Sequence, residues 1–143
     1  PGAVQQNYDL VKQNKEKFML PLRMDLTNPS PDLGWHNAER ESMQARGPVD
    51  LVMALALIHH LAISNNVPLV DVADYFADLG EYLIIEFVPK SDSQVKRLLA
   101  SRLDIFPDYT LEGFRNAFSL LYDTITEEKV PGSERTLFLL QKK

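Results

Sequence analysis

The stretch that decides the fold is VDLVMALALIHHLAI, residues 49 to 63. A carboxylate near its start is followed by eight apolar residues and then by two adjacent histidines, His59 and His60. An unbroken apolar run of this length is typical of a strand that is buried on both faces, as in a parallel sheet. We therefore expect a strand over residues 49–57 that delivers the histidines to the carboxyl end of a sheet.

Helical and strand patterns alternate along the rest of the chain. Such alternation indicates one α/β domain, with a parallel sheet and helices on both of its faces. Sheets of this kind bind ligands beyond the carboxyl ends of their strands. The expected helices lie at 4–18, at 38–46 after Asn37, at 69–79 after Pro68, at 95–102 after a capping box of Ser91 and Gln94, and at 111–121 after Thr110; the expected strands lie at 20–26, 49–57, 81–89, 122–130 and 135–143, the last two as a hairpin.

Composition excludes several classes of protein. The chain has 143 residues, of which 45% are hydrophobic, so it can fold around a core. Its net charge of -5 argues against coating of nucleic acid or binding to an anionic membrane surface. It has no cysteine, which excludes disulfides and zinc–thiolate sites. Its six glycines form no phosphate-binding cluster such as GxGxxG.

The sequence shows no membrane-spanning segment and no secretory signal. No apolar run reaches the roughly 18 residues that span a bilayer. The first twenty residues are polar and mixed in charge, unlike a secretory signal. We therefore expect a cytoplasmic protein with no membrane partner. The chain begins at Pro1 and not at Met, so we also expect it to be incomplete.

The two histidines allow three interpretations. On a helix, adjacent residues point about 100° apart, which argues against both histidines holding one metal ion, and no HExxH spacing is present. One histidine could serve as a general base, because its pKa lies close to neutral pH. The alternative is that both are structural. We expect no metal site.

Three further positions are candidates for chemistry. Asp25 ends the expected strand at 20–26, where its carboxylate could accept a hydrogen bond from an amine such as that of adenine; the alternative, for Asp25 and for Asn28, is a turn former. Glu86 lies inside a buried strand and needs a partner. Glu86 could pair with Lys90, Arg97 or Arg102, or it could reach the site at the strand end. Trp35 and His36 could line an acceptor pocket.

Several segments, taken in order, resemble class I S-adenosylmethionine-dependent methyltransferases. VDLVMALALIHHL at 49–61 is similar to the fourth motif of that family, in which a strand opens with Asp and ends near two histidines. PLRMDLTNPSP at 21–31 resembles the third-strand segment, and EYLIIEFVPKSDSQVKRLL at 81–99 the fifth strand with its loop. Residues 106–143 resemble the last helix and a terminal antiparallel hairpin. Within the family, the chain is most similar to the bacterial nodulation-related methyltransferases.

The resemblance also marks what is missing. The first strand, the glycine-rich loop and the ribose-binding acid have no counterpart, and residues 1–8 resemble the segment that follows that acid. This implies that residues 1–143 are the C-terminal part of a single class I methyltransferase domain, a Rossmann-like sheet that lacks its first two strands. Those two strands would separate the strand of Met24 from the strand of Met53. The strand at 49–57 would therefore have an unpaired edge, covered by the missing N-terminal half or by a second subunit.

Site residues follow from the same resemblance. They would bind S-adenosylmethionine and an unidentified methyl acceptor; methyl transfer depends on in-line geometry, so a base is dispensable. The implied assignments are Asp25 and Leu26 at the adenine, Ala54, Leu55 and Ala56 beside the methionine moiety, His59 or His60 as catalytic, and Trp35 and Asn28 on the acceptor side.

Two other functions stay open. One is a non-catalytic, methyltransferase-like binding or scaffold module, which the missing glycine-rich loop favours if this chain is the whole protein. The other is an unrelated flavodoxin-like α/β protein. A strand followed by GxGxG upstream of Pro1 would decide for the enzyme.

Overall fold

The computed structural model describes residues 2–143, and the chain divides after Ser30 into two compact units. In the first unit, helix α1, Gly2–Asn14, has no buried residue. It ends earlier than residue 18 because Lys15 takes a left-handed conformation with φ of 52°, while the Glu16 N–H donates to the Val11 carbonyl at 2.9 Å. The expected strand at 20–26 is wrong. Within the described residues that segment pairs with no strand, and Pro21 can donate no backbone hydrogen bond.

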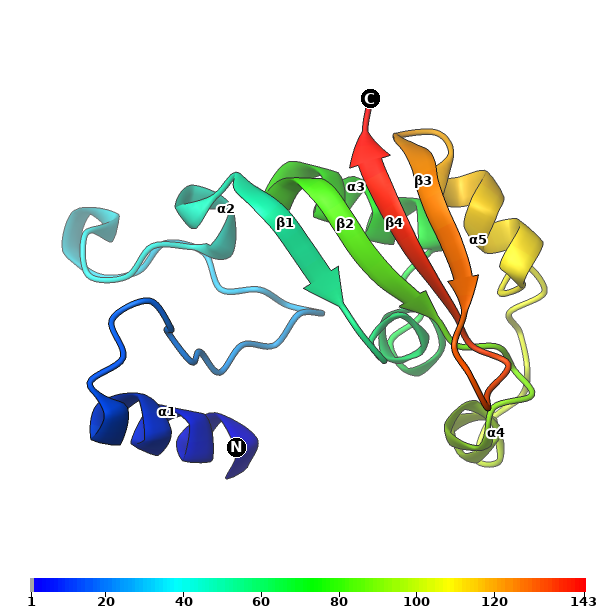
Figure 1. Ribbon diagram of the computed structural model, residues 1–143, viewed down its shortest axis with the longest axis horizontal. Helices are drawn as coiled ribbons and strands as arrows, with labels where there is room; N and C mark the ends of the chain where they lie inside the picture. Colours follow the sequence, from blue (N-terminus) through cyan, green and yellow to red (C-terminus); the bar gives the residue numbers. More distant parts are fainter. Residues whose placement is uncertain (1) are drawn as a thin grey trace. The chain divides into compact units, whose positions relative to one another are not determined.

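The second unit, Pro31–Lys143, is built on a four-stranded sheet (Figure 1). Its strands are β1, Val49–Ala54; β2, Gly80–Phe87; β3, Tyr122–Lys129; and β4, Thr136–Lys142, in the order β1-β2-β4-β3. β1 and β2 are parallel, whereas β4 is antiparallel to both of its neighbours. The parallel pair and the terminal hairpin confirm the α/β expectation, in a mixed sheet.

Short helices precede and connect these strands. They are η1, Trp35–Asn37; α2, Met43–Arg46; the π-helix η2, His60–Ser64; α3, Leu69–Leu79; α4, Ser93–Leu99; and α5, Leu111–Phe118. Thr110 caps α5 as predicted, through a bond from the Gly113 N–H. Two other predicted caps are wrong: Ser42 caps α2 in place of Asn37, and Asp92 caps α4 in place of Ser91.

Gly80 joins α3 to β2 without a loop. Its N–H donates to the Phe76 carbonyl and closes the helix, and the same residue pairs with Val49 as β2 begins. A Cβ atom at this position would lie 2.7 Å from the Val49 carbonyl oxygen, so glycine lets the two strands start side by side.

The core lies on one face of the sheet. Leu83 and Ile85 of β2 are fully buried and pair with the equally buried Leu140 and Phe138 of β4. Helices α3 and α5 contact each other on this face; in Figure 1, α3 lies behind the strands and α5 beside β3. Aromatic rings fill the space under α5, where Phe114 stacks 4.2 Å from Phe118 and lies 4.7 Å from Phe138. The predicted apolar stripe of α3 is confirmed, and its buried members are Val72, Ala73, Phe76 and Leu79.

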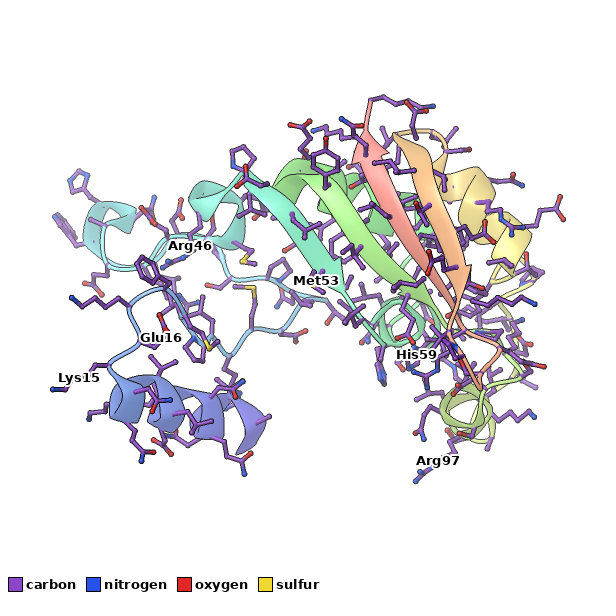
Figure 2. All side chains as sticks on the ribbon, in the orientation of Figure 1. Lys15, Glu16, Arg46, Met53, His59 and Arg97 are labelled. Carbon is purple, nitrogen blue, oxygen red and sulfur yellow. The ribbon has the colours of Figure 1, made fainter. Side chains whose placement is uncertain are left out.

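The opposite face of the sheet is apolar but partly exposed, and we call it the open face. It is defined by Leu51 and Met53 of β1, Tyr82 and Ile84 of β2, and Leu139 of β4, which the strand register places side by side. Met53, labelled in Figure 2, is 60% exposed. Two expectations are therefore wrong within Pro31–Lys143. The strand at 49–57 was expected to be buried on both faces, but β1 is not. Helices were expected on both faces of the sheet, but α3 and α5 share one face.

The edge of β1 is unpaired among the described residues, since β2 is its single neighbour in the sheet. A free strand edge beside exposed apolar side chains favours pairing with another chain. We predict that residues 1–143, produced alone, self-associate, and that Met53→Lys shifts the population towards the 16.3 kDa monomer. Sedimentation velocity over a range of concentrations measures this.

Leu120→Lys is the matched control, because Leu120 is equally exposed but follows α5 and lies outside the sheet. If residues 1–143 sediment as a monomer at every concentration, the prediction of self-association is wrong. If Leu120→Lys shifts the population towards the monomer as far as Met53→Lys does, association does not occur at the β1 edge and its adjoining face.

Candidate functional site

The candidate site lies at the carboxyl end of β1. The strand stops at buried Ala54, three residues earlier than predicted, and the next two residues, Leu55 and Ala56, are exposed. Ala56 has φ of 50°, which is the left-handed region. For a residue with a Cβ atom this conformation costs about 1 kcal/mol, so it persists where the surroundings enforce it. We call residues 55–57 the β1 loop.

The carboxylate of Glu86 holds this loop. The Ala56 N–H donates to Glu86 Oε2 at 2.7 Å. Glu86 lies near the end of β2, just beyond the last paired residues of β1 and β2, Ala54 and Ile85. A side chain thus accepts the bond that a continuing strand would have supplied from its backbone. A hydrogen bond to a carboxylate is about twice as strong as one between neutral groups.

Arg135 is the partner of Glu86. Its Nη1 atom lies 3.3 Å from Glu86 Oε1, and its Nε atom donates to Asp92 Oδ2 at 2.9 Å. The Glu86 side chain is only 12% exposed, so the pairing offsets the cost of burying its charge. The hydrogen bond from Arg135 lowers the pKa of Asp92, and the same bond raises the pKa of Arg135.

The partners predicted for Glu86 are wrong. Lys90 pairs with Asp104 at 2.8 Å, and the described contacts include none between Arg97 and Glu86. Arg102 donates to the carbonyl oxygens of Ile63 and Ser64, at the end of η2. No local sequence pattern indicates Arg135 as the partner, because it is 49 residues from Glu86.

The histidines differ sharply in environment. His59 lies past the end of β1, where η2 begins (Figure 2), and is 2% exposed. Burial, reinforced by the neighbouring His60, lowers the pKa of His59 to about 4. Among the described residues its Nδ1 atom has no hydrogen-bond partner. His60 is exposed, with its ring centroid 4.2 Å from that of His59. His60 is therefore the histidine that a ligand can reach.

The other predicted site residues belong to other parts of the chain. Asp25, Leu26 and Asn28 belong to the first unit. There the Asp25 carboxylate accepts bonds from the Thr27 side chain at 2.7 Å and from its N–H at 2.9 Å, which lower the pKa of Asp25 and form a turn. This is the alternative that the sequence left open.

Trp35 belongs to the second unit but not to the β1 loop. It is 83% exposed and contacts the ring of His36 edge-on at 5.4 Å. Figure 1 shows its segment (cyan) beside α2, towards the amino end of β1. The structure thus brings together Ala54, Leu55, Ala56, His59 and His60, with Glu86, and leaves Trp35 apart from them. Residues 2–143 contain no group of three or more potential metal ligands, and none of their helices has the length and apolar character to cross a bilayer.

His59 should make stability depend on pH. In the unfolded chain a histidine binds a proton below about pH 6.5, whereas folded His59 does so only below about pH 4. Stability is therefore lost as the pH falls from 6.5 towards 4. We predict that the free energy of unfolding falls between pH 7 and pH 4.5 by roughly 2 kcal/mol less in His59→Leu than in the wild-type protein. Urea unfolding at the two pH values measures this difference. His60→Leu is the control, and an equal reduction in both variants would contradict the assignment.

Comparison with known proteins gives one strong similarity. No family model matches the sequence, and no solved structure matches it. The chain is 43% identical over 142 residues to nodulation protein NoeA of Rhizobium meliloti (strain 1021). The alignment covers 99% of the chain but 30% of that protein, so the chain spans less than a third of its relative's length. The relative's name refers to nodulation and specifies no reaction.

Proposed function

We propose that the chain is the C-terminal part of a class I methyltransferase domain, which transfers a methyl group from S-adenosylmethionine to an unidentified acceptor. The observation that carries the proposal is the arrangement of the second unit. A parallel pair, β1 and β2, is followed by an antiparallel hairpin, in the order in which the resemblance expects strands four, five and the terminal pair. β1 also has its free edge where the missing strands belong.

The β1 loop fits the methionine end of the cofactor. Ala56 is exposed and has a small side chain, and Leu55 is half exposed, so a ligand can approach the loop backbone closely. Backbone carbonyls suit the positive charge of a sulfonium, and no side chain of the loop carries a charge. The residues that would hold the ribose are not among these 143, and they would come from a preceding segment or a second subunit.

His60 is the candidate for handling the proton of the acceptor. S-adenosylmethionine, when bound, supplies a methyl group on a positively charged sulfur, and transfer breaks that carbon–sulfur bond and leaves a neutral thioether. Exposed His60 begins η2, three residues after the β1 loop, where it could accept the proton that the acceptor loses. His59 stays neutral and buried at the start of η2. Asp25 and Leu26 remain the proposed adenine contacts, and Asn28 and Trp35 the proposed acceptor contacts.

A non-catalytic binding module is the second candidate function. It is favoured by the absence of a glycine-rich phosphate or nucleotide loop from these residues. Binding of the cofactor product separates the two functions most simply, because a scaffold has no need to bind S-adenosylhomocysteine.

We predict that Asp25→Ala weakens S-adenosylhomocysteine binding in the protein as it is produced in the cell. One hydrogen bond to a neutral amine is worth about 1–2 kcal/mol, or about 5- to 30-fold in Kd. Isothermal titration calorimetry measures the affinity, and circular dichroism checks the fold.

Asp9→Ala is the control for this experiment, since Asp9 is exposed in the same unit and its carboxylate accepts a hydrogen bond from Gln5 of the same helix. Residues 1–143 alone should show no detectable binding. Unchanged affinity of Asp25→Ala would remove Asp25 from the site, and a wild-type protein without affinity would favour the scaffold.

A further inference from the structure

Glu86 is the one buried carboxylate at the carboxyl end of β2, and both of its oxygens are in use. Oε2 accepts the Ala56 N–H at 2.7 Å, and Oε1 faces Arg135 Nη1 at 3.3 Å. The residue lies at the end of the sheet where the candidate site is, and both of its carboxylate oxygens are taken by protein groups. This geometry suits a residue that acts on a ligand through a neighbouring group.

The rotamer of Glu86 is fixed from behind. Arg135 is held in turn by Asp92, whose second oxygen accepts the Gln94 N–H at 2.8 Å and caps α4. We call Glu86, Arg135 and Asp92 the anchor network. It joins four segments that are distant in sequence: the β1 loop, the end of β2, the start of α4 and the β3–β4 hairpin. A second link, between Ser91 and Glu134, ties the start of α4 to the same hairpin.

The conformation of Ala56 makes the loop depend on this network. An alanine with φ of 50° is strained, and the strain persists while its N–H has a strong acceptor. Without the Glu86 carboxylate, the Ala56 N–H loses this acceptor and the loop gains access to ordinary backbone conformations. Leu55 and Ala56 would then present their carbonyls and side chains in many directions.

We propose that Glu86 is a positioning residue that holds the backbone of Leu55 and Ala56 in the one conformation that receives the methionine end of the cofactor. The inference rests on the proposed function for the identity of the ligand. Its structural part, that the carboxylate holds the Ala56 peptide, is independent of it. A purely structural ion pair would stabilise the fold without setting the affinity through Ala56.

A double-mutant cycle between Glu86 and Ala56 separates these roles. In the protein as it is produced in the cell, Glu86→Gln should weaken S-adenosylhomocysteine binding about tenfold. The reason is that the amide is a weaker hydrogen-bond acceptor for the Ala56 N–H and carries no charge for an ion pair with Arg135. In an Ala56→Gly background the same change should cost only about two- to threefold, since glycine adopts positive φ without strain. Calorimetry measures all four proteins. Equal losses in the two backgrounds would overturn the proposal.

Glu81→Gln is the matched control, because Glu81 is an exposed residue of the same strand at its opposite end. It should leave the affinity unchanged, and a loss as large as that of Glu86→Gln would also overturn the proposal.

Amide hydrogen exchange tests the structural part without a ligand. Glu86→Gln should lower the protection of the Ala56 N–H about tenfold more than that of the other amides of β1 and β2. A uniform loss across both strands, or no loss at Ala56, would show that Glu86 does not hold this peptide. If the wild-type protein binds no S-adenosylhomocysteine, the proposed function fails, and this exchange result alone decides whether Glu86 positions the loop.

Discussion

The hydrogen bond from the Ala56 N–H to the Glu86 carboxylate is the interaction on which the candidate site depends. It ends β1, holds the next residues in a left-handed turn and leads the chain towards η2 with His59 inside and His60 outside. Breaking a largely buried ion pair by removing one partner costs about 3 kcal/mol or more, so Glu86 and Arg135 also tie the hairpin to the rest of the unit. Stability and the shape of the site thus share the same few atoms.

The second constraint is that helices cover only one face of the described sheet. α3 and α5 bury one face under aromatic rings, whereas Met53 and the other apolar residues of the open face remain partly exposed. The free edge of β1 adjoins this face, so one covering element could complete both. A relative of more than three times the aligned length has ample chain for such an element. The incomplete face and the missing cofactor-binding motifs are therefore explained by one cause under the proposed function.

Local signals in the sequence predicted β2, α3 and the Thr110 cap well, because periodicity and capping act within a few residues. The strand at 20–26 failed because a strand needs a partner, and its pattern says nothing about whether one is present. Burial of β1 was mispredicted for the same reason. Arg135 was missed because a charged residue in a turn after Pro131 gives no sign that it will reach Glu86. The unlike environments of His59 and His60 follow from the turn at Ala56, and sequence patterns do not predict positive φ at alanine.

The most direct test of this account is an experimental structure of the protein as it is produced in the cell, determined with S-adenosylhomocysteine. The account predicts a further strand hydrogen-bonded in parallel along Val49–Ala54, with the ligand's homocysteine moiety against the backbone of Leu55 and Ala56. A β1 edge that faces solvent, or a ligand bound away from the β1 loop, would contradict it.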